Sequence, residues 1–241
     1  MSTFRFKKFN VVNERSAMKV NTDGVLLGSL MTILPDDRRL LDVGTGTGTI
    51  ALMAAQRLSE VCSEPFVIEA IDIDKDSADE ARANFSESPW ASSLRLCHAS
   101  LDEFAPQAGE YDLIFSNPPY FEDSLTAPDL RKSAARHTSD GLSYRDIFEF
   151  AEKRLTENGR VAFVLPSEQE QALCRFGRMC GLHLFRITRV RTVPRKASSR
   201  MIAEFARCRC ENPEDTTLTI QSEGAYTQEY LSVMKDFYLF A

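Results

Sequence analysis

Three glycines spaced two residues apart lie between a strand pattern and a helix pattern, in the segment Leu41-Asp42-Val43-Gly44-Thr45-Gly46-Thr47-Gly48-Thr49. Such a turn lets a ligand touch the backbone, because glycine has no Cβ. Two interpretations are open. Gly46, Gly48 and Ala51 satisfy the dinucleotide-binding pattern G-x-G-x-x-G/A. The carboxylate of Asp42 beside the loop favours a cationic ligand, such as a sulfonium.

An acidic residue follows the next expected strand, Phe66 to Ile71. Asp72 stands 24 residues after Gly48 and can accept hydrogen bonds from both hydroxyls of a ribose. Asp74 is the alternative, although it can instead cap the following helix. Because a nicotinamide cofactor and S-adenosylmethionine both carry a ribose, this acid does not separate them.

The turn after the expected strand Tyr111 to Phe115 separates the two ligands. It reads Asn117-Pro118-Pro119-Tyr120. Two prolines remove two backbone donors and stiffen the chain, and Asn117 is pushed to an extended conformation because it precedes proline. The turn presents two acceptors, the side-chain oxygen of Asn117 and the carbonyl of Pro118. A planar amine can donate to both and stack its ring on Tyr120.

These motifs resemble those of class I S-adenosylmethionine-dependent methyltransferases that act on amino groups. In that class, N-P-P-Y binds the amine of adenine, guanine or a glutamine side chain. Further segments resemble the bacterial family that methylates N6 of adenine 37 in tRNA1(Val): Phe4 to Phe9, Ala17 to Gly28, Ala135 to Thr138 and Tyr226 to Tyr230. The resemblance runs from about residue 4 to the C-terminus and implies this methyl transfer, with tRNA as substrate.

The resemblance also implies site residues. The catalytic turn consists of Asn117, Pro118 and Tyr120, with Pro119 beside the substrate. The residues expected to contact the methyl donor are Lys19, Thr22, Asp42, Gly44, Gly46, Gly48, Asp72, Ser100, Leu101 and Asn117. Relatives often carry aspartate at the place of Ser100, where it accepts from the adenine amine of the donor. That contact is open between Ser100 and Asp102.

The implied chemistry depends on positioning. The N6 lone pair of adenine is delocalised into the ring, so acceptors at Asn117 and Pro118 favour tetrahedral attack and stabilise the developing positive charge. The methyl group moves in line from sulfur to nitrogen, and the donor is already activated. No dedicated base is required, because the product cation is acidic. The target adenine must leave its stack to react.

A basic segment near the C-terminus predicts contact with RNA. Ten lysines and arginines, but only one acid (Glu204), lie from Arg175 to Arg209 in a chain of net charge −6. Alternation along a strand places two of the arginines on one face, and the loop that follows adds two more cations. The residues expected to bind tRNA phosphates are Arg189, Arg191, Arg195 and Lys196.

Apolar runs that alternate with helical patterns predict a doubly wound, Rossmann-like α/β sheet, with ligands at the carboxyl ends of its strands. The sheet is expected to be mostly parallel and to end in an antiparallel hairpin, Leu182 to Val193 with Met201 to Arg209. A strand over Phe4 to Phe9 and a helix over Val25 to Leu34 precede it. We expect residues 1–34 to pack on the methyltransferase domain, residues 35–241, as a single domain overall.

The composition, 43% hydrophobic and 27% charged, excludes global disorder. No apolar stretch reaches the roughly 18 residues of a membrane span, and the N-terminus lacks a signal-peptide core. We therefore expect a cytoplasmic protein without a membrane or obligatory protein partner. Of six cysteines, only Cys208 and Cys210 lie close together, and no second pair or nearby histidine follows, so no metal site is expected.

Other functions remain alternatives. A glutamine N5 protein methyltransferase would use the same turn but would not explain the basic segment, and a guanine N2 methyltransferase of ribosomal RNA is a second alternative. A nicotinamide-dependent oxidoreductase leaves N-P-P-Y unexplained. A non-catalytic RNA-binding module is disfavoured by the intact Asp42, Asp72 and Asn117.

Overall fold

The computed structural model describes residues 2–16, 18–119 and 141–241. Its strands are β1 (Thr3–Arg5), β2 (Asn10–Val12), β3 (Arg39–Val43), β4 (Val67–Asp72), β5 (Leu94–His98), β6 (Tyr111–Ser116), β7 (Leu155–Pro166), β8 (His183–Arg191), β9 (Arg200–Ala206), β10 (Glu214–Thr219), β11 (Gln221–Ser222) and β12 (Ala225–Tyr226). Its α-helices are α1 (Thr22–Leu30), α2 (Thr49–Val61), α3 (Lys75–Ser86), α4 (Leu101–Phe104), α5 (Tyr144–Arg154), α6 (Glu170–Met179) and α7 (Gln228–Met234).

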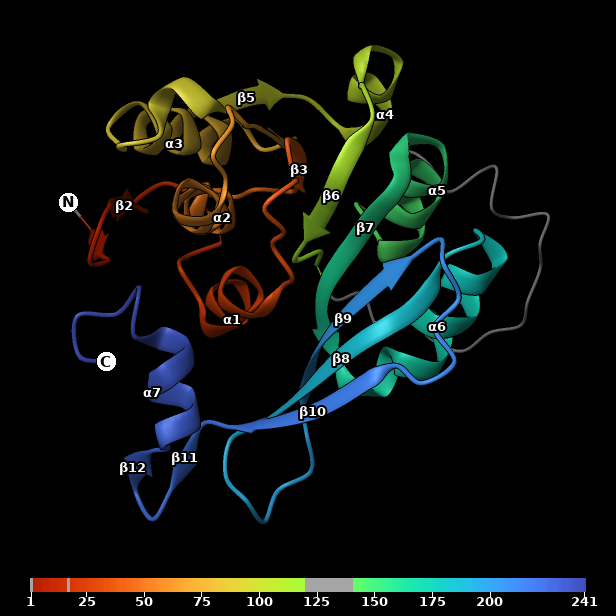
Figure 1. Ribbon diagram of the computed structural model, residues 1–241. Coiled ribbons are helices and arrows are strands. Elements are labelled where there is room, and N and C mark those ends of the chain that lie inside the picture. Colours follow the sequence, from red (N-terminus) through yellow and green to blue (C-terminus); the bar gives the residue numbers. More distant parts are fainter. Residues whose placement is uncertain (1, 17, 120–140) are drawn as a thin grey trace.

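Eight of these strands form one sheet, in the order β10-β8-β9-β7-β6-β3-β4-β5 (Figure 1). Neighbouring strands run parallel except at β9, which is antiparallel to both β7 and β8. The predicted doubly wound, mostly parallel sheet with a C-terminal antiparallel hairpin is confirmed. Since β3, β4 and β6 are parallel neighbours, their carboxyl ends meet at one edge of the sheet.

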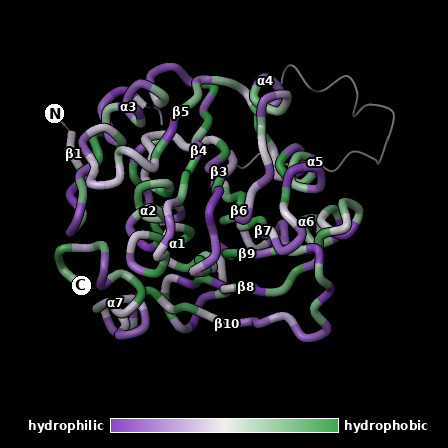
Figure 2. Tube along the Cα trace, turned by 45° about the horizontal axis from the view of Figure 1, so that its top comes forward, coloured by the Kyte–Doolittle hydropathy of each residue, from purple (hydrophilic) through white to green (hydrophobic). Residues whose placement is uncertain are grey.

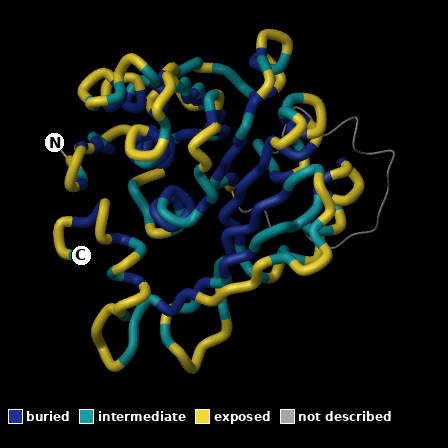
Figure 3. Tube along the Cα trace, in the orientation of Figure 1, coloured by how far each residue is buried: buried dark blue, intermediate teal, exposed yellow. Residues whose placement is uncertain are grey.

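Helices cover both faces of the sheet (Figure 1). Residues of α1, α2, α3 and α7 share one buried apolar cluster, and residues of α4, α5 and α6 share the other. Figure 3 shows the buried positions following the central strands, with exposed positions on outer helices and projecting loops. The near-continuous apolar sequence of the central strands follows from this burial on both sides.

The N-terminal segment corrects one expectation. A single strand was expected over Phe4 to Phe9, but β1 ends at Arg5, and a turn leads into β2, with the Phe6 N–H donating to the Phe9 carbonyl over 2.9 Å. The rings of Phe6 and Phe9 stack with their centroids 4.5 Å apart, and both are buried. The apolar alternation therefore reflects two aromatic residues on either side of a turn, both directed into one core.

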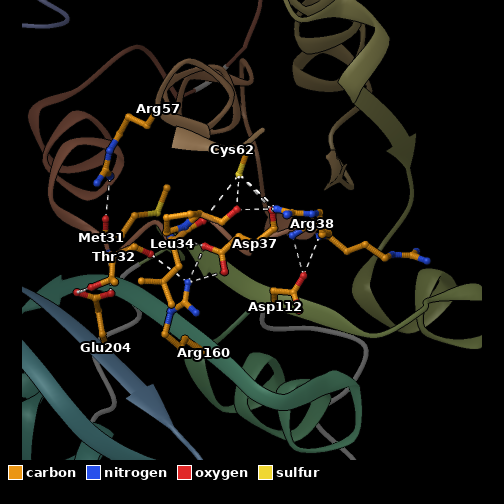
Figure 4. A network of polar contacts seen from close by, with 12 residues as sticks. Met31, Thr32, Leu34, Asp37, Arg38, Arg57, Cys62, Asp112, Arg160 and Glu204 are labelled. Carbon is orange, nitrogen blue, oxygen red and sulfur yellow. Dashed lines mark hydrogen bonds and ion pairs between the residues drawn. The ribbon is translucent and has the colours of Figure 1, made fainter. Parts of the chain in front are cut away.

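Buried polar contacts hold the end of α1 (Figure 4). Arg57 of α2 donates to the Gly28 carbonyl in the last turn of α1 over 2.9 Å and to the carbonyl of the C-cap residue Met31 over 2.8 Å. Carbonyls at this end of a helix have no partner inside it. Glu204 of β9 accepts from the Thr32 N–H over 2.7 Å. Arg160 of β7 forms an ion pair with Asp37 over 2.7 Å, with side chains only 7% and 3% exposed. These contacts attach α1 and the turn into β3 to the sheet.

The strand β10 adds an edge to the sheet and runs parallel to β8. Its first four residues are exposed, and its last two are buried. Figure 2 accordingly shows β10 as largely hydrophilic. Polar side chains on an edge strand discourage pairing with another chain.

Candidate active site

The glycine loop joins β3 to α2 and owes its shape to backbone conformations with positive φ. Gly44, Gly46 and Gly48 have φ angles of 72°, 57° and 81°. A Cβ on Gly48 would lie 2.4 Å from the ring of Phe85, so that glycine is required for packing. A Cβ on Gly46 would meet no atom within 4 Å among the described residues. The loop therefore packs tightly at Gly48 and exposes bare backbone at Gly46, where a ligand can approach.

Asp42 is a buried carboxylate beneath this loop. Its side chain is fully buried, and its Oδ2 accepts from the hydroxyl of Thr45 over 2.7 Å. Within the described parts of the chain its Oδ1 has no hydrogen-bond partner. Burial raises the pKa of Asp42 to about 7, the Thr45 hydrogen bond opposes that rise, and repulsion from Asp72 adds to it. A cationic ligand nearby would favour the ionised carboxylate.

Asp72 is the last residue of β4 and faces the same loop. Its Oδ2 accepts from the Gly46 N–H over 2.7 Å, and its Oδ1 accepts from the Asp74 N–H over 2.8 Å. Burial raises its pKa, although both hydrogen bonds lower it. Asp74 caps α3 by accepting from the Ser77 N–H over 2.8 Å. Asp74 is thus occupied as a helix cap, and the contact of Asp72 with a ribose stays a prediction.

The Asn117 turn directly follows β6. The hydroxyl of Ser116, the last strand residue, donates to the Val43 carbonyl over 2.6 Å and so ties the ends of β6 and β3 together. Asn117 is half-buried, Pro118 is buried and Pro119 is exposed. Tyr120 lies outside the described residues, as does the predicted segment Ala135 to Thr138. The glycine loop, Asp72 and Asn117 thus share one edge of the sheet.

Ser100 and Leu101 follow β5 at the same edge. Ser100 caps α4: its hydroxyl donates to the Glu103 carboxylate over 2.9 Å and accepts from the Glu103 N–H over 3.2 Å. The Leu101 side chain packs in the core, so only its backbone can face a ligand. Asp102, the alternative to Ser100, is exposed. Because the Ser100 hydroxyl already serves the cap, one of its lone pairs remains for a further hydrogen bond.

Lys19 and Thr22 lie where the N-terminal segment enters α1. Thr22 is exposed and begins the helix, and the preceding Asn21 caps it by accepting from the Gly24 N–H over 2.8 Å. The Lys19 ammonium donates to the carbonyls of Asn13 and Glu14 over 2.6 and 2.7 Å. In this structure Lys19 therefore stabilises its own segment, and a contact with the donor stays a prediction.

The four cations expected to bind RNA fall into two kinds. Arg189 lies between Glu170 and Asp215, with shortest contacts of 2.6 and 3.0 Å, and Arg191 donates to the Thr219 hydroxyl over 2.8 Å. The tip residues Arg195 and Lys196 are exposed, and neither has an ion pair with another described residue. The charge of Arg189 is compensated within the chain, whereas the charges of the tip have no carboxylate partner among the described residues.

Comparisons with known proteins agree with this geometry. The family model of the methyltransferase small domain matches residues 16–175. Relatives named tRNA1(Val) (adenine(37)-N6)-methyltransferase are 42% identical in Parabacteroides distasonis, over 98% of this chain and 97% of theirs, and 38% identical in Flavobacterium johnsoniae, over 98% and 99%. The chain belongs to this family. A predicted O-methyltransferase from Agrobacterium tumefaciens shares the fold, with a TM-score of 0.60 at 18% identity over 89% of this chain and 96% of that one.

Membership confirms the predicted class, an S-adenosylmethionine-dependent methyltransferase. The residues fit this cationic donor. Asp42 has a buried oxygen without a hydrogen-bond partner in the described structure, and Gly46 leaves open space in front of its backbone. Asp72 stands at the neighbouring strand end. The donor contacts of individual residues remain predictions.

Sequence reasoning missed two residues of this methyltransferase that lie next to the site. Glu80 and Asn84 of α3 are each 3% exposed and make hydrogen bonds to the N-terminal segment. The available signal was a polar stripe at helical spacing, formed with Ser77, on a side of α3 that also carries buried alanines. Polar residues on a buried helix side require partners.

Proposed function

We propose that the chain transfers a methyl group from S-adenosylmethionine to N6 of adenine 37 in the anticodon loop of tRNA1(Val). One observation carries this proposal: the glycine loop with Asp72 and the Asn117 turn lie at adjacent carboxyl ends of the same sheet. The first suits a nucleoside-containing donor, and the second suits a planar amine. Full-length relatives with the same named activity support it.

In this proposal the donor supplies a methyl group already activated on a sulfonium sulfur. Asp42 and Asp72 place negative charge beside the loop that binds it, and Asp72 accepts from the ribose hydroxyls. Asn117 and Pro118 accept from the two N6 protons, direct the nitrogen lone pair toward the methyl group and stabilise charge developing on nitrogen. Tyr120 stacks on the base.

The tRNA approaches from the same edge in this proposal. The segment between β8 and β9, with exposed Arg195 and Lys196, projects from the carboxyl end of β8 (Figure 1). Two exposed cations there suit a phosphate backbone. No helix in the described parts of the chain combines the length and apolarity that a membrane crossing demands. The cytoplasm, where tRNA is modified, is part of the proposal.

The test is methylation of unmodified tRNA1(Val) by the purified protein with labelled donor, followed by nucleoside analysis. We expect N6-methyladenosine with the natural tRNA and none with a transcript that carries guanine in place of adenine 37. N2-methylguanosine in ribosomal RNA, or label on a protein glutamine, would replace this proposal with one of the two alternatives.

A further inference from the structure

A buried polar face of α3 holds the N-terminal segment. Ser77, Glu80 and Asn84 are spaced by three and four residues, which places them on one side of the helix. They are 4%, 3% and 3% exposed. Burial of a carboxylate and an amide is costly unless their hydrogen bonds are satisfied, so the partners of this face show what it does.

Glu80 binds three consecutive backbone N–H groups of the N-terminal segment. Its Oε1 accepts from the N–H groups of Glu14 and Arg15 over 2.7 and 2.6 Å, and its Oε2 accepts from that of Ser16 over 3.1 Å. The hydroxyl of Ser16 also lies 2.8 Å from that of Ser77. A buried carboxylate thus receives its compensation from the main chain of a segment that has no helix or strand of its own there.

Asn84 joins the same segment to the glycine loop. Its Oδ1 accepts from the Val12 N–H over 2.8 Å, and its Nδ2 donates to the Val12 carbonyl over 3.0 Å. The same Nδ2 donates to the Thr47 carbonyl over 2.9 Å. One side-chain amide therefore fixes the N-terminal segment against the loop that faces the donor.

A second chain of hydrogen bonds leads from this face to the donor site. Ser77 donates its N–H to Asp74, the Asp74 N–H binds Asp72, and Asp72 accepts from the Gly46 N–H. The segment held by Glu80 continues directly into Lys19, whose ammonium binds two carbonyls of that same segment.

We infer that Glu80 and Asn84 are positioning residues for the methyl donor. They act through residues 12–16, which they hold against α3 and the glycine loop as a fixed wall of the donor site. The inference rests on the proposed function only in taking the glycine loop as the donor site. A merely structural role predicts lost stability in variants without a specific loss of donor affinity.

The test measures two quantities in Glu80→Gln and Asn84→Ala. Amide hydrogen exchange without donor should become faster at Glu14, Arg15 and Ser16 in Glu80→Gln, because the amide keeps one acceptor oxygen where the carboxylate had two. In Asn84→Ala it should become faster at Val12, whose N–H loses its acceptor. The Kd for S-adenosylmethionine, measured by calorimetry, should rise roughly tenfold, within the range seen for coupled sites. Glu80→Gln keeps the size of the side chain, so it stays informative if Asn84→Ala does not fold.

Two controls separate positioning from stability. Glu87→Gln makes the same chemical change at the exposed end of α3 and should alter neither quantity. Leu173→Ala removes a fully buried side chain of α6 on the other face of the sheet and should lower Tm while leaving the donor Kd unchanged.

Each other outcome has a defined meaning. Faster exchange with an unchanged donor Kd would overturn the inference, because the segment would then not belong to the donor site. Unchanged exchange would also overturn the inference, because Glu80 and Asn84 would then not hold the N-terminal segment in place. If the wild-type protein binds no S-adenosylmethionine, the proposed function itself fails, and this result is distinct from both.

Discussion

Two halves of the sheet handle charge in opposite ways. In the half that carries the glycine loop, Asp42 is buried and Asp72 is half-buried, and neither forms an ion pair with a lysine or arginine of the described structure. In the distal half, Arg186 contacts both Glu204 and Glu214, and Arg189 contacts both Glu170 and Asp215. The two acids near the glycine loop have no lysine or arginine partner among the described residues, whereas each of these arginines contacts two carboxylates.

This difference indicates which charged groups are available to a ligand and which serve only the fold. A buried carboxylate without a cation costs free energy that a positively charged ligand recovers on binding. An arginine held between two carboxylates has little to gain from a phosphate, because the phosphate must displace or repel an acid. Substitutions in both halves test this division.

The largest effect is expected at the catalytic turn. Asn117→Ala should lower kcat about 10²- to 10³-fold, the usual cost of removing one group aimed at developing charge. The Kd for S-adenosylmethionine should stay near its wild-type value. Single-turnover kinetics with tRNA1(Val) measure the step directly, and a wild-type rate would remove Asn117 from the mechanism.

Asp72→Ala should weaken donor binding. Loss of hydrogen bonds to an ionised acceptor costs roughly 1.5–3 kcal/mol, which corresponds to about a ten- to hundredfold rise in Kd. Because Asp72 also accepts from Gly46, part of the loss comes from the loop. Calorimetry measures it. An unchanged Kd would place the ribose elsewhere, since Asp74 is occupied as a helix cap.

The raised pKa of Asp42, about 7, predicts pH-dependent donor binding. If the cationic donor binds the ionised form, affinity should fall about tenfold between pH 8 and pH 6, in proportion to the ionised fraction. Binding near pH 7 should release a proton, detectable by calorimetry in buffers of different ionisation enthalpy. Asp42→Asn should abolish that release; a wild-type protein that releases no proton contradicts the prediction.

The same group affects stability without donor. Its folded pKa of about 7 exceeds the ordinary 3.8, so the folded state holds the proton more tightly than the unfolded state. Its contribution to the free energy of unfolding is therefore complete below about pH 4 and is lost as pH rises through 7. Denaturant titrations of wild type and Asp42→Asn should diverge over that window.

The smallest effect concerns the distal half. Changing Arg195 and Lys196 to Gln should flatten the slope of log K against log salt for tRNA binding by about 0.7–0.9 per lost contact. Donor affinity should stay unchanged. Arg189→Gln is the matched comparison: it should lower Tm and leave the salt slope nearly unaltered, because its carboxylate partners compensate its charge. If Arg189→Gln flattened the salt slope and the change at the tip did not, the phosphate contacts would lie on β8.

Much of the site could be predicted because its signals are local. The glycines permit the positive φ angles that the loop adopts. Asp72 ends a strand whose apolar run is plain in the sequence, and Asn117-Pro118-Pro119 stiffens its own turn. The alternation over Phe4 to Phe9 wrongly predicted a single strand, because a turn can direct aromatic residues to one side just as a strand does. The helix expected to run to Leu34 ends at Leu30 in the structure. The carbonyls at that end accept from Arg57, which belongs to another helix.

By itself, the sequence determined the parallel sheet and the places of the glycine loop and the Asn117 turn at the ends of its strands, since each depends on neighbours within a few residues. Only the tertiary structure decided which charges remain available. Arg189 meets Asp215 after 26 residues, and Glu80 meets the Glu14 N–H after 66. The physical reason is that a charge is free or compensated according to the groups that folding brings within hydrogen-bond distance, and composition along the chain does not record that distance.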